Sequence, residues 1–417
     1  MEKTGAVSAT SSGVSLRDLL TIPVIVASLG YFVDIYDLIL FSIVRVSSLK
    51  AVGLQGQALL DQGVFLLNIQ MGGMLLGGIL WGVLGDKKGR VKILFGSIFL
   101  YSMANFANGF VTSIGAYAAW RFIAGVGLAG ELGAGVTLVI ENLPKGSRGY
   151  GTMIVATVGV TGAILAYFVA NHYDWRVAYF IGGGLGLALL ITRISVFESG
   201  MYKEIEDKHV SKGNFFSLFT DRDRFYRYMQ SILIGLPIWY AVGILITFSP
   251  EFARVLGVTG PVYAGEAVMF CYLGLVFGDF ASGFMSQYFG SRKKVVFLFQ
   301  ILAGISIAVY FVLRGVSPAL FYAHCMAIGF AVGYWAIFIT IGAEQFGTNL
   351  RATVASTVPN FIRGMVIPIT FSFKYLKEHI GILHSAAIVG AVCLLISFYA
   401  LYHLEETFHK DLNFLED

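Results

Sequence analysis

Two carboxylates, Asp34 and Asp37, stand three residues apart in the apolar stretch YFVDIYDLILF. Residues at positions i and i+3 share a helix face, so the two side chains are expected to point the same way. A charge at the centre of a bilayer is costly, and two adjacent carboxylates in a medium of low dielectric constant do not both ionise cheaply. The pattern is therefore typical of a proton-binding site.

Arg121, in a later apolar stretch, is the predicted partner of Asp37, because both are expected in the outer half of their helices. Arginine keeps its proton in proteins, so it needs a counter-ion wherever its surroundings are dry. Deprotonated Asp37 would pair with Arg121, and protonation of the aspartate would free the arginine and allow the helices to rearrange. The alternative is a fixed structural pair that only holds two helices together.

Glu131 lies ten residues after Arg121, in the stretch GVGLAGELGAG. An acid inside the membrane must find a partner or stay protonated. A role in proton coupling and a packed, protonated hydrogen-bond donor are both open for Glu131. The surrounding glycines predict close helix approach. Arg193, near the inner end of its span, is expected to extend toward the lipid headgroups.

The C-terminal half places Arg363 deep in the stretch STVPNFIRGMVIPITF. Pro359 and Pro368 interrupt the regular helix near it, so free backbone groups can face a cavity. A buried, permanently charged arginine is typical of a clamp for carboxylate or phosphate. Asp279 is the rival partner, and a pair between the two would remove the need for a negatively charged substrate.

Other polar and aromatic residues could line a cavity for a small organic ligand, although a single aromatic residue more often serves packing or the interfacial belt than ligand contact. The predicted substrate-binding set is Arg363, Asn360, Tyr36, Gln70, Trp239, Tyr240, Tyr334 and Trp335. The chain has no metal-ligand spacing and none of the motifs of metalloproteases, α/β-hydrolases or phosphate-binding loops. We therefore expect no enzyme activity, no metal and no cofactor other than a proton as coupling ion.

The amino-acid composition indicates that these residues lie in a lipid bilayer. Of the 417 residues, 57% are hydrophobic and only 13% are charged, with a mean hydropathy of +0.75. An ordinary soluble chain carries about 25% charge. No soluble core has room for this apolar surplus, so the chain is predicted to be an integral membrane protein. No nucleic-acid-binding patch is present.

Turn and charge clusters divide the chain into stretches of about 20 apolar residues, the length that spans a bilayer. Twelve are predicted: 19–44, 64–84, 93–111, 114–140, 150–171, 177–197, 229–249, 262–289, 295–313, 318–343, 352–375 and 383–403. The predicted organisation is all-α, with a tail (1–18), a six-helix bundle (19–197), a linker (198–228), a second six-helix bundle (229–403) and a second tail (404–417). The linker is expected to form either an interfacial helix or a solvated connection.

The distribution of Lys and Arg predicts the orientation, because cytoplasmic loops carry the excess of these residues. With both termini in the cytoplasm, the inner segments hold 19 of the 29 basic residues, the outer segments hold seven, and three lie within spans. We therefore expect both termini to be cytoplasmic and the protein to reside in the plasma (inner) membrane.

The two halves of the chain repeat each other. Three positions correspond at an offset of 201, since Gly82, Asp86 and Gly89 align with Gly283, Gln287 and Gly290. The segment ENLPKGSR matches EQFGTNLR at an offset of 203, so that Glu141 and Arg148 correspond to Glu344 and Arg351. Two six-helix repeats side by side allow one bundle to rock against the other around a midplane site.

The loop Gly82–Arg90 and its weaker copy resemble the signature of the major facilitator superfamily, and the resemblance covers the whole chain. It implies two pseudo-symmetric six-helix bundles that work by alternating access. It also assigns a gating role to Gly82, Asp86, Gly89, Arg90, Glu141, Arg148, Glu344 and Arg351. The alternative for the loop is a positively charged segment that only sets the topology.

Further stretches narrow the branch of the family. RFIAGVGLAGE, ENLPKGSRG and FESGMY resemble sugar porters and related metabolite:proton and organic-ion carriers, and DIYD is similar to the paired aspartates of aromatic-acid:proton symporters. The resemblance matches Asp37 and Arg121 to the aspartate of span one and the arginine of span four in sugar porters. It matches Arg363 to an arginine in span eleven of organic-anion carriers. Because Gln287 replaces the aspartate of the second signature loop, a sugar substrate is not predicted.

The sequence thus predicts a monomeric secondary transporter in the lipid bilayer, a proton symporter for a small organic anion such as a carboxylate. A facilitator or antiporter for a neutral or cationic solute, in which the pair Asp37–Arg121 is structural, is one alternative. A transporter-like sensor is the other.

Overall fold

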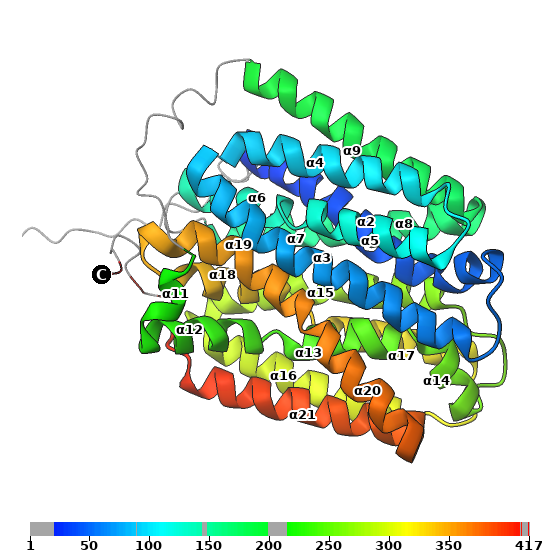
Figure 1. Ribbon diagram of the computed structural model, residues 1–417. Helices are drawn as coiled ribbons and strands as arrows, with labels where there is room; N and C mark the ends of the chain where they lie inside the picture. Colours follow the sequence, from blue (N-terminus) through cyan, green and yellow to red (C-terminus); the bar gives the residue numbers. More distant parts are fainter. Residues whose placement is uncertain are drawn as a thin grey trace, which may run out of the picture.

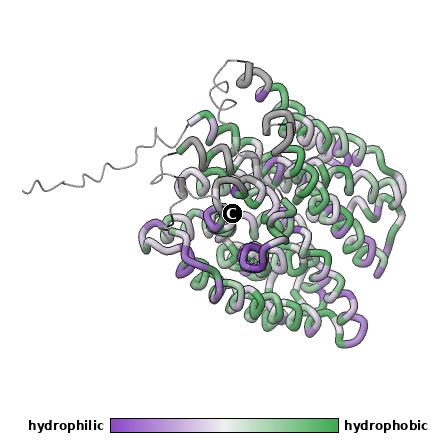
Figure 2. The backbone as a smooth tube through the Cα atoms, turned by 60° about the vertical axis from the view of Figure 1, so that its left-hand side comes forward, coloured by the Kyte–Doolittle hydropathy of each residue, from purple (hydrophilic) through white to green (hydrophobic). Residues whose placement is uncertain are grey.

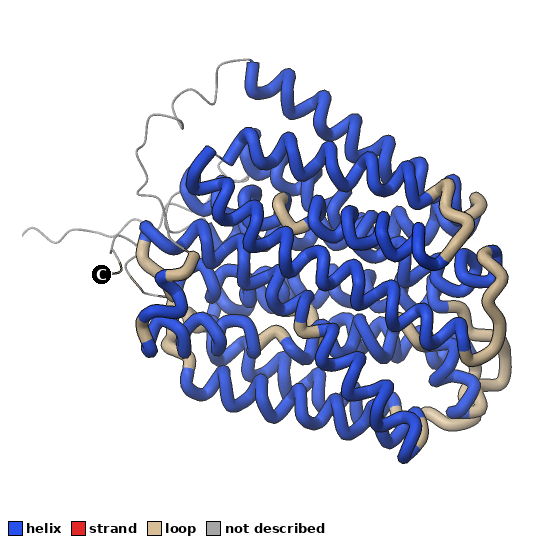
Figure 3. The backbone as a smooth tube through the Cα atoms, in the orientation of Figure 1, coloured by secondary structure: helices blue, strands red, loops and turns tan. Residues whose placement is uncertain are grey.

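The computed structural model describes residues 21–88, 90–143, 148–198, 215–408, 410 and 416. These residues form helices and connecting loops and contain no strand (Figure 3). Ten segments among them are long and apolar enough to cross a membrane. The other two predicted spans correspond to α4 (Arg90–Asn108) and to the pair α5 (Ile114–Leu128) and α6 (Glu131–Asn142). The predicted twelve-helix fold is therefore confirmed.

The first bundle is drawn in blue to green in the upper part of Figure 1. Its helices α2 and α3 are followed by α4, by α5 with α6, by α7 with α8, and by α9. The bounds not yet given are α2 (Ile22–Ala51), α3 (Ala58–Lys88), α7 (Arg148–Val160), α8 (Gly162–His172) and α9 (Trp175–Glu198). Helix α2 packs against α6, α7, α8 and α9, so the carboxylates that it carries lie away from lipid.

The second bundle follows below it in green to red (Figure 1). It begins with α11 (Ser217–Thr220), α12 (Arg222–Leu233), α13 (Leu236–Tyr240), the π-helix η1 (Ala241–Ile246) and α14 (Ser249–Leu256). It continues with α15 (Ala264–Phe289), α16 (Arg292–Tyr310), α17 (Pro318–Ala331), α18 (Trp335–Glu344), α19 (Thr348–Gly364), α20 (Val366–Ile380) and α21 (Ile382–His403). The predicted interfacial helix of the linker lies partly outside the described residues.

Hydrophobic residues predominate along the helices of both bundles (Figure 2). Many large apolar side chains are exposed on the outer surface, among them Phe371, Leu395, Ile191 and Val312. An apolar surface of this extent is suited to lipid rather than water. The bundles meet where α19 packs against α3 and α6, and where α15 packs against α7 and α8.

Two spans are interrupted at corresponding positions of the repeats. The fourth span breaks at Ala129–Gly130, between α5 and α6, and the tenth breaks at 332–334, between α17 and α18. The offset between these breaks is the one that relates Glu141 to Glu344. At the second break a Cβ added to Gly333 would lie 2.5 Å from the Cα of Gly278, so only glycine allows this contact between the break and α15. Paired breaks of this kind mark the ligand site of many transporters.

The two ends of the bundles are named here by the segments they carry. The linker face is the end that holds α11, the start of α12 and residues 404–408, on the left of Figure 1. The far face is the opposite end, which holds the turns at 52–57 and 257–263.

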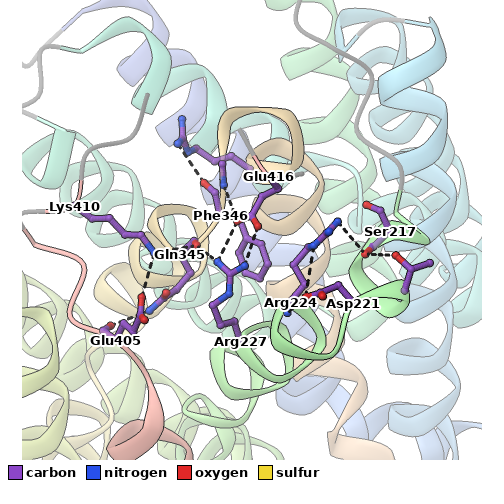
Figure 4. A network of polar contacts seen from close by, with 12 residues as sticks. Ser217, Asp221, Arg224, Arg227, Gln345, Phe346, Glu405, Lys410 and Glu416 are labelled. Carbon is purple, nitrogen blue, oxygen red and sulfur yellow. Dashed lines mark hydrogen bonds and ion pairs between the residues drawn. The ribbon is translucent and has the colours of Figure 1, made fainter. Parts of the chain in front are cut away.

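Described residues of the second tail bind the linker face (Figure 4). Glu416 accepts two hydrogen bonds from Arg227, of 3.0 and 2.8 Å, and one from the backbone N–H of Gly347 over 3.2 Å. Arg227 also donates to the carbonyl of Gln345 over 2.9 Å. Burial raises the pKa of the Glu416 carboxyl, but the hydrogen bonds and charge of Arg227 and the Gly347 amide outweigh it, so the pKa lies below its usual range.

We expect Glu416→Gln to loosen the tail by about 1 kcal/mol, because the lost pair is partly exposed. Since the pKa of Glu416 is lowered on docking, its contribution is present above the pKa of a free glutamate and is lost as the pH falls through the lowered value. Limited proteolysis of the tail measures this at neutral and acidic pH. Glu405→Gln is the matched control, because Glu405 is exposed and its contact with Lys410 is 3.4 Å long. Equal cleavage of both variants at neutral pH would contradict the prediction.

Candidate functional site

Arg363 and Asp34 form an ion pair across the interface between the bundles. Nη2 of Arg363, on α19, donates to Oδ2 of Asp34, on α2, over 3.4 Å. Both side chains are fully buried. Asp279, the predicted rival, is not the partner. Because the two residues are 329 positions apart in the chain, nothing in the local sequence pattern indicated the contact.

Two tryptophans flank the Arg363 guanidinium. Its Cζ lies 5.8 Å from the ring centre of Trp239 and 5.7 Å from that of Trp335, and the two indoles meet edge to face. Cation–π attraction of this kind is strongest where water is excluded. Nε and Nη1 of Arg363 and Nε1 of Trp239 have no hydrogen-bond partner among the described residues. Buried donors without partners are thus grouped around Arg363, which favours an acceptor-rich ligand such as a carboxylate.

Tyr31 belongs to the same place although it was not predicted. It lies on α2 one turn before Asp34 and is buried. It is within electrostatic range of Arg363, Asp34 and Asp279, and its hydroxyl is near the side chain of Trp335. Its spacing of three residues from Asp34 was the only signal that the sequence offered.

Asp37 faces the interior of the first bundle instead of the interface. A Cβ at Gly182, on α9, would collide with Oδ1 of Asp37, and Asn105 of α4 lies beside the carboxylate. The side chain is fully buried, and neither oxygen has a hydrogen-bond partner in the described segments that meets standard geometry. Asp34 and Asp37 therefore lie in different surroundings, although they occupy one turn of one helix.

Arg121 contacts Gln70 and not Asp37. Its Nη2 donates to Oε1 of Gln70, and its guanidinium lies 4.9 Å from the ring centre of Phe41. Asp37 and Arg121 interact electrostatically, yet no ion pair within 4.0 Å joins them. The predicted contact is absent from this conformation, because the amide of Gln70 and the ring of Phe41 hold the guanidinium elsewhere.

Glu131 is paired with Arg193. Both guanidinium Nη atoms donate to the carboxylate, Nη1 over 3.1 Å, and Nη2 also contacts the carbonyl of Val26 on α2. Both side chains are buried. The prediction that Arg193 extends to the headgroups is wrong, because Glu131 at the start of α6 provides a counter-ion inside the bundle. A role of Glu131 in proton coupling stays a prediction.

Four other residues of the predicted substrate-binding set donate hydrogen bonds to backbone carbonyls. Tyr36 donates to Ala178, Tyr240 to Ala386, Tyr334 to Ile234, and Asn360 to Ala129, over 2.9, 2.6, 3.0 and 2.8 Å respectively. The first three contacts lie within one bundle, whereas the fourth joins the two. Of the predicted aromatic residues, the structure brings only Trp239 and Trp335 to Arg363.

Part of the predicted gating set can be placed. Gly82 faces Thr357 of the second bundle, with 3.8 Å between an added Cβ and that side chain. Glu344 pairs with Arg292 over 3.3 Å, and Arg351 donates to the carbonyls of Ala343 and Phe346. Gly89 and the side chains of Asp86, Arg90, Glu141 and Arg148 lie outside the described residues.

A second ion pair between the bundles lies at the far face and was not predicted. Nη2 of Arg45, on α2, donates to both oxygens of Glu251, on α14, over 2.8 and 2.9 Å, and to the carbonyl of Thr247 over 3.2 Å. Arg45 is fully buried, and Glu251 is 23% exposed. The sequence showed Arg45 only as one of the basic residues at this end.

Comparison with known proteins identifies relatives over most of the chain. The model of the Major Facilitator Superfamily matches residues 25–369. The chain is 23% identical over 386 residues to the putative niacin/nicotinamide transporter NiaP of Bacillus subtilis (strain 168), covering 89% of this chain and 94% of that protein. It is 24% identical over 353 residues to the gentisate transporter of Corynebacterium glutamicum, covering 80% and 73%. The family and these relatives are transporters and not enzymes, as the sequence predicted.

Solved structures share the fold. The proton:xylose symporter XylE matches with a TM-score of 0.72 at 16% identity, covering 94% of this chain and 97% of that chain. The transporter FucP in the outward conformation matches with a TM-score of 0.69 at 14% identity, covering 93% and 99%. At these identities the likeness concerns the fold alone.

We expect removal of one partner of the pair Glu131–Arg193 to be strongly destabilising. Glu131→Gln or Arg193→Met leaves a polar or charged group buried without its partner, which costs about 3–5 kcal/mol for a buried ion pair. The double variant should recover much of this loss, and thermal unfolding of the purified protein in detergent measures all three. Arg314→Met, at an exposed position, is the control. Additive losses in the double variant would contradict the pairing.

The pair Arg45–Glu251 is expected to hold the far face closed. In Glu251→Gln the Arg45 charge loses its carboxylate, so alkylation of a cysteine placed at the buried Ser42 should accelerate about tenfold, as expected for a charge-assisted contact. Arg254→Gln, which removes an exposed charge from the same helix, should leave the rate unchanged. An unchanged rate in Glu251→Gln would show that other contacts close this face.

Proposed function

Because this chain is a transporter of the Major Facilitator Superfamily, we propose that its substrate is a small carboxylate that bears a planar ring, carried together with a proton by alternating access. The observation that carries this proposal is Arg363 at the bundle interface, flanked by Trp239 and Trp335. The guanidinium suits a carboxylate, and the indoles offer flat apolar surfaces to the rest of the ligand.

The relatives support this substrate class. One relative is named as a putative niacin/nicotinamide transporter, and another is named as a gentisate transporter. Niacin, nicotinamide and gentisate are ring compounds of the expected size. The support is chemical as well, since a sugar has no negative charge to balance Arg363.

We infer that Asp34 is the acid that couples the proton to the substrate. In the described conformation Asp34 neutralises Arg363. A proton on Asp34 removes that counter-charge, and the substrate carboxylate then takes its place on the arginine. Release of the substrate and loss of the proton restore the ion pair. Substrate and Asp34 thus compete for one guanidinium, and protonation decides the competition.

Asp37 and Arg121 are proposed as a second element of the same coupling. Each is buried without an ionic partner within 4.0 Å among the described residues, and each interacts electrostatically with the other. Once Asp37 loses a proton, Arg121 is a cation within its reach. This scheme keeps the switchable pair predicted from the sequence and adds a second acid with a separate arginine.

The orientation proposed from the basic residues places the linker face in the cytoplasm. The linker residues Arg222, Arg224 and Arg227 and the loop residues Arg292, Lys293 and Lys294 lie at this end, which agrees with the excess of positive charge expected on cytoplasmic loops. We propose the plasma (inner) membrane as the location and a monomer as the working unit.

Uptake by proteoliposomes tests the coupling. An inside-alkaline pH gradient should drive accumulation of a radiolabelled aromatic acid by the wild type. Asp34→Asn is a permanent mimic of the protonated acid, so it should lose gradient-driven accumulation but keep exchange between labelled and unlabelled substrate. Accumulation that persists in Asp34→Asn would rule out coupling through this residue. Uptake without any effect of the pH gradient in the wild type would favour a facilitator.

Ligand-induced thermal stabilisation of the purified protein tests the substrate class. Benzoate and nicotinate should stabilise the wild type, whereas benzamide and nicotinamide, which have the same rings but no charge, should do so at least about tenfold more weakly. Arg363→Lys should lose most of the preference for the acids, since lysine cannot bind a carboxylate in a bidentate manner. Arg254→Lys is the control at an exposed site. Stabilisation by the amides alone would overturn the proposed clamp.

A further inference from the structure

Asp279, on α15, is a buried carboxylate that the coupling scheme above does not use. Its side chain is fully buried, and its Oδ1 accepts a hydrogen bond from the backbone N–H of Ala336 over 3.2 Å. Oδ2 has no hydrogen-bond partner within the described part of the chain. Ala336 belongs to the first turn of α18, whose own N-cap residue, Tyr334, gives no side-chain cap. Asp279 therefore caps α18 from a neighbouring helix.

The capped half-helix closes the linker-face half of the interface. All residues of α18 are buried, and α18 packs against α7 of the first bundle. The hydroxyls of Thr340, on α18, and Thr152, on α7, are 3.2 Å apart. Ala336 and Ile339 of α18 also face Leu132 on α6. Movement of α18 away from α7 would open this side of the transporter.

The same half-helix carries a wall of the proposed substrate site. Trp335, its first residue, lies beside Arg363 and stacks on Phe338 with 5.0 Å between ring centres. A shift in the first turn of α18 would therefore reach both the linker-face closure and the ligand. The break at 332–334 allows such a shift without movement of α17.

The acid at the corresponding break of the first bundle has a charged partner, unlike Asp279. Glu131 starts α6 and is bound by the permanently charged Arg193. No ion pair within 4.0 Å reaches Asp279 from the described residues, and its charged form is favoured only by backbone N–H groups and the positive end of α18. Glu131 is thus held by a permanent positive charge, whereas Asp279 is held by a backbone N–H group.

The neighbours of Asp279 do not supply another charge. Tyr31 of α2 is within electrostatic range, and beyond it Asp34 and Arg363 neutralise each other. The titratable groups of α17 and α18 have other partners. Tyr322 accepts a hydrogen bond from the backbone N–H of Tyr263, and His324 contacts the carbonyl of Ser306. Cys325 is buried near Cys271, and Glu344 pairs with Arg292.

We propose that Asp279 is a positioning residue whose protonation releases α18 and opens the linker face. As a carboxylate it holds the first turn of α18 by charge-assisted hydrogen bonding, which is roughly twice as strong as bonding to a neutral acceptor. A proton added to Oδ2, the oxygen without a partner, leaves Oδ1 as a neutral carbonyl and weakens the cap. The inference rests on the alternating-access part of the proposed function and needs no assumption about the substrate.

Alkylation of a cysteine at Thr340 measures the opening without any substrate. The protein with Thr340→Cys is placed in nanodiscs, treated with N-ethylmaleimide, and analysed by peptide mass spectrometry, which separates this site from the three native cysteines. Rates are normalised to denatured protein at the same pH, because thiolate content itself changes with pH. We expect the normalised rate to rise about fivefold between about pH 8 and about pH 5.5, the change that loss of a helix cap of ordinary strength produces.

Three variants assign the change to Asp279. Asp279→Asn, which is always neutral, should react fast at both pH values and lose the pH dependence. Glu266→Gln, which neutralises an acid in the first turn of the same helix, is the matched control and should keep it. Asp34→Asn, which tests the proposed coupling, should also keep it, so failure of that coupling and failure of this inference give different results.

The outcomes that overturn the inference are equally defined. A wild-type rate that does not depend on pH overturns it without any variant. A pH response that survives in Asp279→Asn also overturns it. If Asp279→Asn does not fold, Asp279→Glu keeps a titratable cap on a longer side chain and should move the midpoint of the response, whereas an unchanged midpoint counts against the proposal.

Discussion

A guanidinium that cannot release its proton must be neutralised or solvated wherever a protein removes it from water. Arg363, Arg193 and Arg121 are all buried in this membrane protein, and each meets the requirement in a different way. Arg363 takes a carboxylate from the opposite bundle, Arg193 takes one from its own bundle, and Arg121 has the amide of Gln70. The first arrangement couples the relative position of the bundles to charge, the second stabilises one bundle, and the third leaves a cation in need of a stronger partner.

The two repeats share their backbone plan but differ in chemistry. Both interrupt the fourth helix of the repeat, and both bring an acid to the half-helix that follows. In the first repeat this acid is bound by Arg193, whereas in the second it comes from another helix and, among the described residues, accepts hydrogen bonds from backbone N–H groups. The symmetry therefore gives similar hinges, and the side chains decide how firmly each hinge is held. Arg121 also lies beside aromatic rings, but these belong to Phe41 and Tyr179, whereas two indoles flank Arg363.

Helix extents could be predicted from the sequence, because continuous apolar stretches bounded by charge define membrane spans almost without tertiary information. The partners of the buried charges could not. The depth of each charged residue along its helix could be estimated from the sequence, but the direction of its side chain around the helix axis could not. Three residues advance a helix by about 300°, so the side chains of Asp34 and Asp37 differ by about 60° in direction. That angle turns Asp34 to the bundle interface and Asp37 toward Gly182. Arg193 was misjudged for a similar reason, since its distance from the membrane surface was visible in the sequence and its contact with Glu131 was not.

The pair Asp34–Arg363 also has an electrical consequence for the whole transport cycle. In the ion pair of the described conformation the two opposite charges cancel. In the loaded site of the proposed cycle, a protonated Asp34 is neutral and the monovalent carboxylate cancels Arg363. The site therefore carries no net charge in either form, so one proton and one substrate anion would cross together without current. A carrier that takes up its proton on Asp34 alone draws its driving force from the difference in proton concentration and is insensitive to membrane voltage.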